Sequence, residues 1–276
     1  MTALWITLSV LCFLLLLFLF LICPALRRHP DRALMDGMVI AHRGLHDLPD
    51  RPGTPENSMA AFREAIRAGY AIETDIHLTA DGEVVVFHDD TLDRMCGVSG
   101  SPETMTLAEL RALRLAGTDE TIPTFAEFLD LVNGQVPLLI EFKCLTKAQA
   151  YALCEKAAPM LDGYKGAYMV QSFFPFMLGW YKKHRPTVCR GQLSSAFKGQ
   201  SFVRRLAGCL LFNVIGRPDF VSYDHRDAGH PCRRLCTVLG AHPVCWTLHS
   251  QDELDTARER YGFRTFIFEG FLPSDT

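Results

Sequence analysis

The sequence lacks an excess of either charge, and it lacks internal repeats and low-complexity tracts. Lys and Arg number 28, Asp and Glu number 31, and the net charge is −3 at pH 7. A chain without a basic excess has no general field that attracts nucleic acid, so we expect no nucleic-acid partner. The 276 residues, 49% of them hydrophobic, are enough for one large domain with a sizeable core.

The ten cysteines lack the spacing of a disulfide framework. A domain of this size needs no disulfides, and we interpret them as reduced thiols. One group leaves a structural zinc site open as an alternative. Its irregular spacing, and the position of its last member on an expected strand, favour ordinary core residues. The group comprises His230, Cys232, Cys236, His242 and Cys245.

Charged residues are also missing from Leu4 to Cys23. About 20 apolar residues are enough to cross a bilayer core as a helix. A cleaved secretory signal requires basic residues before the apolar block and a small-x-small motif after it, and both are missing here. We therefore predict that residues 1–24 form an uncleaved transmembrane anchor, with a signal peptide as the rival interpretation.

Basic residues follow the apolar block but none precedes it: Arg27, Arg28 and Arg32. Basic residues that flank a membrane-spanning helix stay on the cytoplasmic side. We therefore expect a single-pass protein of the cell membrane, with its N-terminus outside and the rest of the chain in the cytoplasm. Residues 25–36 are predicted to be a linker. At full extension it reaches about 40 Å, which would allow either face of the domain to approach the bilayer.

Beyond the linker, short apolar runs alternate with helical patterns, which predicts an α/β fold with a mainly parallel sheet. About eight βα units over residues 37–276 fit a (β/α)8 TIM barrel, with an open doubly wound sheet as the alternative. Residues of about 90–123 show little βα character, and we expect a small insertion after the second strand. The expected strands are 38–41, 71–78, 84–87, 137–142, 167–171, 188–191, 220–223, 244–248 and 265–268.

Helices are expected between these strands. The first should start at Thr54-Pro55 and end at Gly69, because a cap residue followed by proline is typical of a helix start. The apolar segment 201–216, with Arg204 and Arg205, either lies on the membrane or forms an ordinary barrel helix, and we favour the barrel helix. Further helices are expected at 124–133, 146–161, 175–184, 231–239 and 251–261.

The strand "AIETDIHL" places Glu73, Asp75 and His77 on one face, because alternate residues of a strand share a face. The outside of a barrel strand is covered by helices, so the carboxylates should point into the barrel or its mouth. Two close carboxylates repel each other, and a divalent cation offsets that repulsion. Oxygen ligands suit Mg²⁺ or Ca²⁺. The alternative is an exposed strand with one polar face.

Further polar residues end other strands, where barrel enzymes place their chemistry. Glu141 and Lys143 share one face in "PLLIEFKCL"; Glu141 would complete the metal's carboxylate set and Lys143 would neutralise a phosphate oxygen.

His42 and His88 also end strands and can serve as acid and base for a phosphodiester. Arg43 can bind a phosphate bidentately. Glu56, in "TPENS", is a candidate to orient Arg43 or to bind the metal; the alternative is a first-turn acid at a helix N-terminus.

The ordered set "AHRG", "PENS", "ETDIHLTADGEVVVFHDDTLDRMCG", "EFK", "QSF" and "WT" closely resembles the glycerophosphodiester phosphodiesterase family, from about Val39 to Leu272. The resemblance implies a TIM barrel with a small insertion. It also implies metal-dependent hydrolysis of glycerophosphodiesters to sn-glycerol 3-phosphate and an alcohol, a reaction of glycerophospholipid metabolism.

The resemblance also implies roles for single residues. His42 and His88 resemble the acid/base pair, Arg43 resembles the phosphate-binding arginine, and Trp246 matches an aromatic residue of the substrate pocket. The carboxylates of Glu73, Asp75 and Glu141 resemble the metal ligands. Glu56 and Lys143 match supporting positions of the active site.

Two positions depart from the family pattern. His249 replaces an amide after "WTL", and Glu269 stands where Asp is typical. Both changes bear on substrate choice more than on catalysis. Because the chain is expected to be anchored in the membrane, a lysophospholipase D that acts on membrane lysolipids is an alternative. A membrane-tethered binding protein without activity is the alternative of another class, and the intact early motifs argue against it.

Overall fold

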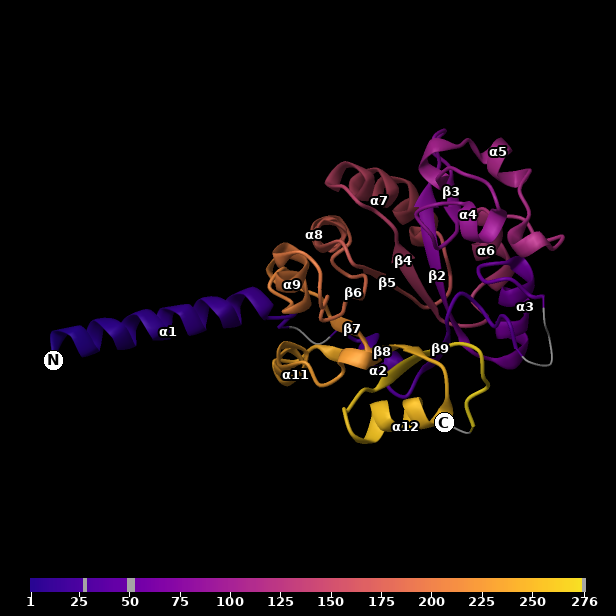
Figure 1. Cartoon of the computed structure of the whole chain (residues 1–276). Coiled ribbons are helices and arrows are strands. Elements are labelled where there is room, and N and C mark those ends of the chain that lie inside the picture. Colours follow the sequence, from indigo (N-terminus) through magenta and orange to yellow (C-terminus); the bar gives the residue numbers. More distant parts are fainter. Residues whose placement is uncertain (27–28, 49–52, 275–276) are drawn as a thin grey trace.

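The short apolar runs of the sequence become the strands of one closed barrel (Figure 1). The computed structural model describes residues 1–26, 29–48 and 53–274. The first strand, β1, pairs in parallel with both β2 and β9, which closes the sheet. The TIM barrel is thereby confirmed, and an open sheet is excluded. The strands are β1 Val39–Ala41, β2 Ala71–Leu78, β3 Val84–Val86, β4 Leu138–Phe142, β5 Tyr168–Ser172, β6 Arg190–Ser194, β7 Phe220–Asp224, β8 His242–Leu248 and β9 Thr265–Phe268.

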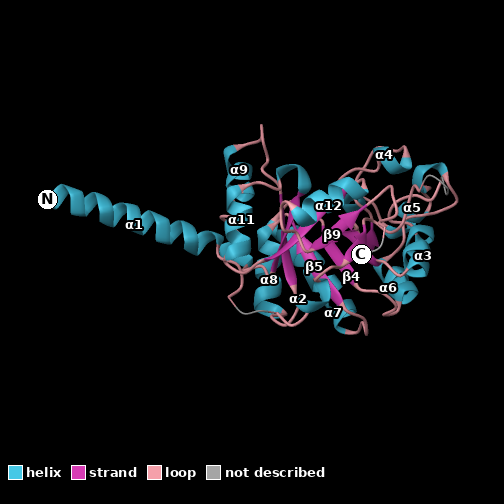
Figure 2. Ribbon diagram, turned by 90° about the horizontal axis from the view of Figure 1, so that it is seen from below, coloured by secondary structure: helices cyan, strands magenta, loops and turns pink. Residues whose placement is uncertain are grey.

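Helices surround the barrel on its outer face (Figure 2). Most follow the strands in the expected order. The four-residue α2 and the short helices of the insertion do not belong to that ring. The helices are α1 Thr2–Ile22, α2 Arg32–Met35, α3 Met59–Ala68, α4 Asp93–Cys96, α5 Leu107–Arg111, α6 Phe125–Val132, α7 Lys147–Asp162, α8 Pro175–His184, α9 Phe202–Gly208, α10 Asn213–Gly216, α11 Pro231–Val238 and α12 Gln251–Glu259.

Two of the expected elements have a limit that differs from the structure by more than two residues, and the helix expected at 201–216 is divided into α9 and α10. The helix expected from Thr54 begins at Met59, after the N-cap Ser58. Asn57 has a φ of +52°, outside the helical range, because its side chain bonds to the neighbouring strand. The strand expected at 188–191 is β6 and continues to Ser194. Its second half carries buried polar side chains, such as Gln192, which the apolar pattern does not reveal.

The core has two main layers and one satellite. Between barrel and helices lies the larger layer, to which alternate strand residues such as Ile72 and Ile76 contribute. The satellite layer packs beneath α4 and α5, where Phe87, Leu92 and Leu110 meet. An inner layer fills the barrel: Met35, Ile40, Ala71, Leu139, Met169, Cys189, Phe220, Val244 and Ile267.

The N-terminal helix α1 extends away from the barrel (Figure 1). Among the described residues it is the one helix long and apolar enough to cross a membrane. Length and composition alone fit an anchor or a signal sequence. Of the basic residues that follow it, Arg27 and Arg28 lie outside the described residues.

The segment between α1 and β1 does not extend to its full reach. The amide of Ala25 donates to the carbonyl oxygen of Pro218 at 2.9 Å, and His29 Nε2 lies 2.7 Å from the carbonyl oxygen of Thr187. Met35 is fully buried against the inner layer of the barrel. The described part of the segment is therefore held against the barrel, and the expected freedom of orientation is not observed.

The possible zinc residues do not converge. His230 accepts from the amide of Cys232, His242 contacts Thr265, and the thiol of Cys236 contacts the carbonyl oxygen of Ile22. These contacts leave the group as separate structural residues, as the irregular spacing indicated.

We predict that His242 makes the protein less stable in mild acid. Burial, with Arg264 nearby, lowers its pKa to about 4. The unfolded chain therefore binds a proton first, and stability is lost as the pH falls from about 6.5 to 4. Between pH 7 and pH 5 the loss should be about 2 kcal/mol. His242→Gln keeps a donor to Thr265 and should remove this loss, measured by denaturant unfolding in detergent. Equal pH dependence of the two proteins would contradict the prediction.

Candidate active site

Six side chains at the mouth of the barrel have the same relation to the inner apolar layer. Each of them follows a residue of that layer by two positions along the chain. Residues two apart on a strand share a face. The inner apolar layer therefore positions the polar residues of the barrel mouth directly above it. The pairs are Ile40 with His42, Ala71 with Glu73, Leu139 with Glu141, Met169 with Gln171, Val244 with Trp246 and Ile267 with Glu269.

Three carboxylates form the centre of the mouth. Glu73 and Asp75 come from β2, and Glu141 comes from β4, which pairs with β2 so that Asp75 lies opposite Glu141. Each offers an oxygen, and these oxygens lie within 4.8 Å of one another. All three residues are buried.

The three carboxyl groups differ in pKa because positive charge reaches them unequally. Burial and the adjacent Asp75 raise the pKa of Glu73 well above its usual value. Burial raises that of Glu141 to about 7, although Lys143 opposes the shift. Burial acts in the same direction on Asp75, but Lys143, His88 and Arg43 outweigh it and hold its pKa below the ordinary range.

This donor set fits a hard divalent cation. Crowded carboxylates favour protonation, as in Glu73, unless a cation shares their oxygens. The ligands are oxygen atoms only, which suits Mg²⁺ or Ca²⁺ rather than a soft metal. The carboxylates can therefore hold a divalent metal, as the family resemblance implies.

Two fixed cations border the carboxylates. Lys143 Nζ lies 2.7 Å from a Glu141 oxygen and 3.0 Å from an Asp75 oxygen. Arg43 donates to Glu56 at 2.8 Å. Arg43 and Gly44 both have a positive φ, and a Cβ on Gly44 would come within 2.9 Å of Ala61. Glycine is therefore required for the turn that brings Arg43 to the mouth.

His42 is held by Glu269, which follows β9. The separation between His42 Nδ1 and the Glu269 oxygen is 2.5 Å. A carboxylate only accepts, so Nδ1–H donates and Nε2 faces the mouth, 3.9 Å from Glu73. Burial and the adjacent Arg43 lower the pKa of His42 to about 4, against the effect of Glu269. The imidazole is neutral at pH 7 and can accept a proton at Nε2.

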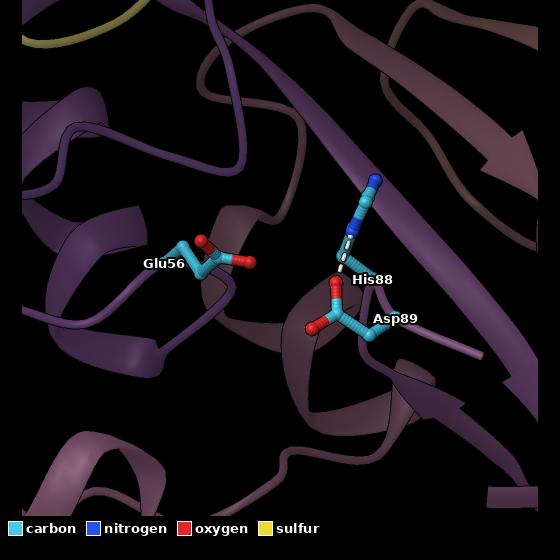
Figure 3. A group of neighbouring side chains, drawn as sticks. All are labelled: Glu56, His88 and Asp89. Carbon is cyan, nitrogen blue, oxygen red and sulfur yellow. Dashed lines mark hydrogen bonds and ion pairs between the residues drawn. The ribbon is translucent and has the colours of Figure 1, made fainter. Parts of the chain in front are cut away.

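His88 is held in the same way by its neighbour Asp89, with 2.6 Å between Nδ1 and the carboxylate (Figure 3). Glu56 lies across from this pair. Arg94 joins them: its guanidinium donates to Glu56 at 2.6 Å and to Asp89 at 2.6 Å. One side chain of the inserted segment thus contacts the carboxylate partners of both Arg43 and His88.

Seven of the nine site residues selected from the sequence line one pocket at the strand ends, and Asp75 and Glu56 lie beside it without lining it. Apolar side chains form another wall, where Phe173 packs edge-on against Trp246 at 5.6 Å between ring centroids. Glu56 borders the pocket through Arg43. The lining residues are His42, Arg43, Glu73, His88, Glu141, Lys143, Gln171, Phe173, Leu193, Trp246, Thr247 and Ile267.

Some residues do not follow the sequence interpretation. His77 shares the face of Asp75 but contacts Glu103 of the inserted segment instead of the pocket. The partners Glu269 and Arg94 are not assigned from the sequence. Glu269 is expected there to affect substrate choice more than catalysis, but the structure places it against His42, a candidate catalytic residue. Asn57 was also missed, and it bonds to Asp75 at 2.9 Å. Its place in "PENS", within a quoted motif, was the available signal.

Comparison with known proteins agrees with this geometry. Residues 42–175 match the model of the glycerophosphoryl diester phosphodiesterase family. The glycerophosphodiester phosphodiesterase of Caldanaerobacter subterraneus is 33% identical over 171 residues, covering 58% of this chain and 67% of that protein. Human glycerophosphodiester phosphodiesterase 1 is 35% identical over 115 residues, covering 38% of this chain and 33% of its own length.

Solved structures share the barrel. The glycerophosphodiester phosphodiesterase of Thermotoga maritima has a TM-score of 0.62 and 25% identity, covering 84% of this chain and 93% of that chain. A phosphodiesterase from Oleispira antarctica, in complex with the product sn-glycerol 3-phosphate, has a TM-score of 0.68 and 23% identity, covering 86% and 94%.

A phosphoric diester hydrolase of the TIM-barrel type is defined by the barrel, by the polar side chains at its mouth and by the segment that matches the family model. This chain belongs to the glycerophosphodiester phosphodiesterase family.

We predict that Asp75→Asn weakens divalent-metal binding by about tenfold or more, because it removes a charged ligand from the centre of the carboxylate set. Calorimetric titration of Mg²⁺ and Ca²⁺ into the detergent-solubilised chain measures the effect. The exposed Asp130→Asn serves as a matched control and should bind as the parent does. Equal affinities of Asp75→Asn and the parent would contradict the assignment.

Proposed function

We propose that the protein hydrolyses glycerophosphodiesters to sn-glycerol 3-phosphate and an alcohol. The observation that carries this proposal is the convergence of two carboxylate-held histidines, two cations and two carboxylates, Glu73 and Glu141, in one pocket, with Asp75 buried beside them in the same carboxylate cluster. The product found in the Oleispira relative supports the same substrate class.

In this proposal Glu73, Asp75 and Glu141 hold a Mg²⁺ or Ca²⁺ ion. When bound, the ion stabilises negative charge on the phosphoryl oxygens. Asn57 and Gln171 support the ligands, since Asn57 donates to Asp75 and Gln171 lies 3.3 Å from Glu73.

Arg43 and Lys143 bind the phosphate. Among the described residues, the Nε atom of Arg43 and the Nε1 atom of Trp246 are buried without a hydrogen-bond partner, and Nε of Arg43 lies 3.8 Å from an oxygen of Asp75. Buried donors are normally paired, so both atoms are available to substrate oxygens. Lys143 stays charged, because Asp75 and Glu141 raise its pKa despite its burial.

His42 and His88 transfer the protons. His42, neutral at pH 7, accepts the proton of the attacking hydroxyl at Nε2 while a new P–O bond forms. His88, in its imidazolium form, donates its Nε2 proton to the departing alkoxide as the P–O bond to phosphorus breaks. Burial lowers the pKa of His88, and Asp75 and Asp89 act against that shift and favour the charged form. Glu269 and Asp89 orient the two rings. Water supplies the atoms that the overall hydrolysis adds.

An apolar wall favours one second candidate. Phe173 is 38% exposed at the pocket and packs on Trp246, which would suit an alcohol that carries an acyl chain. The second candidate is therefore a lysophospholipase D. A barrel without activity is disfavoured, because every candidate catalytic side chain is present and partnered in the pocket.

The first test is hydrolysis by the full chain in detergent. Glycerol 3-phosphate should be released from soluble diesters, and chelation of divalent metal should stop the release. His42→Ala should lower kcat by about a hundredfold or more, because it removes a proton acceptor. His184→Ala, an exposed histidine of α8, should leave the rate unchanged.

Lysophospholipids in the same panel decide between the two candidates. Faster release from lysolipids than from soluble diesters would favour the lysophospholipase D. If neither class is hydrolysed, or if His42→Ala equals the parent, the proposed function is wrong.

A second prediction concerns Arg94. Arg94→Gln should lower kcat/KM by about tenfold, because Glu56 and Asp89 lose the guanidinium that fixes them beside Arg43 and His88. Arg111→Gln is the matched control, since Arg111 pairs with Glu127 on the outside of the same region. A rate for Arg94→Gln within twofold of the parent would show that this contact is dispensable.

We further propose that α1 anchors the barrel on the cytoplasmic side of the cell membrane, with residues 1–24 as the anchor, 25–36 as the connection and 37–276 as the catalytic domain with its insertion at about 90–123. Gln200→Cys lies in an exposed loop of the barrel. It should react with an impermeant maleimide only after permeabilisation, whereas Thr2→Cys should react in intact cells. The parent chain measures the background of native thiols. Labelling of Gln200→Cys in intact cells would reverse the orientation.

A further inference from the structure

The junction between α1 and the barrel is fixed by hydrogen bonds to the last turn of the helix. The carbonyl oxygens that end a helix have no partner within it. Here Asn213 donates to the carbonyl oxygen of Ile22 at 3.0 Å, and Arg217 donates to those of Phe20 and Cys23 at 2.8 Å each. The Arg217 guanidinium also lies 4.6 Å from the centre of the Phe20 ring. These contacts determine which side of the barrel faces along α1.

The helices α9 and α11 lie beside the barrel end of α1 in both views (Figures 1 and 2). Both expose large apolar side chains. Phe202 and Val203, at the start of α9, are 72% and 61% exposed, and Val238, at the end of α11, is 83% exposed. Large exposed apolar side chains on neighbouring helices are candidates for an interaction site.

The helices on this side of the barrel carry basic side chains and no acidic ones. The helices α8, α9, α10 and α11 contain no Asp or Glu. Five of their basic side chains are exposed. We call this set, together with the exposed apolar side chains, the junction surface: Lys182, Lys183, Phe202, Val203, Arg204, Arg205, Arg234 and Val238.

We propose that the junction surface rests on the anionic headgroup layer of the membrane that α1 crosses, with Phe202 and Val203 inserted between headgroups. The inference takes α1 as the anchor proposed above. A helix of 21 residues spans about 30 Å, so the bilayer ends where α1 meets the barrel. The junction surface then lies at headgroup level, where apolar side chains flanked by Lys and Arg bind anionic lipid.

This contact would also place one edge of the barrel mouth at the membrane. Phe197, between β6 and α9, packs on Phe173 at 6.2 Å between ring centroids, and Phe173 lines the catalytic pocket. The aromatic side chains thus connect the pocket rim to the start of the membrane-bound helix.

The test uses the full chain, one copy per nanodisc, with spin-labelled lipids that quench tryptophan near the headgroups. Phe202→Trp should be quenched at least twice as strongly as Val98→Trp in discs that contain phosphatidylglycerol. Val98 is a partly exposed control that follows α4 in the inserted region, and α4 lies far from α1 (Figure 1). The double variant Arg204→Glu, Arg205→Glu should reduce the quenching of Phe202→Trp at least twofold and leave hydrolysis of soluble diesters unchanged.

Equal quenching of Phe202→Trp and Val98→Trp would overturn the proposal. Quenching that is the same in neutral and anionic discs would reject attachment through charge. The native Trp5 in α1 tests the anchor separately. The fluorescence of Trp5 is the difference between the parent and Trp5→Phe, and it should be quenched whenever α1 is inserted in the bilayer. Quenching of Trp5 without quenching of Phe202→Trp would therefore count against the junction surface and not against the anchor.

Discussion

The arrangement of charged side chains at the mouth of the barrel depends on the repulsion among three crowded, buried carboxylates. Oxygens of Glu73, Asp75 and Glu141 lie within 4.8 Å of one another, which is unfavourable unless positive charge is close. Lys143 and Arg43 supply part of that charge. The three carboxylates can hold a divalent ion. Charge balance thus connects the proposed metal ligands to the proposed phosphate-binding groups.

Around this centre, each working side chain is held by a second charged residue. Glu269 orients His42, Asp89 orients His88, and Glu56 holds Arg43. Arg94 connects two of these holders and comes from the inserted segment rather than from the barrel. The insertion therefore contributes to the geometry of the mouth. Rigid partners of this kind keep reacting groups within the small tolerance that proton transfer needs.

Helix α1 is part of the same structural arrangement. Asn213 and Arg217 donate to carbonyl oxygens of its last turn, so the barrel is fixed to the end of the helix. Under the proposed anchoring by α1, this fixed junction limits which surface of the barrel meets the lipid. The basic composition of α8 to α11 is then a property of one side of the barrel, although the whole chain is slightly acidic.

The sequence by itself determined the elements whose signal is local. Alternation along β2 places Glu73 and Asp75 on one face, and an uncharged run defines α1, because both periodicity and composition are read from neighbouring residues. Family motifs marked His42, Arg43, His88, Glu141 and Lys143, which lie at the pocket. Only the tertiary structure brought Glu269 to His42, 227 residues away, because closure of the barrel sets β9 beside β1. It also decided the late start of α3, since the bonds of Asn57 to Asp75 and Thr74 hold its backbone outside the helical range.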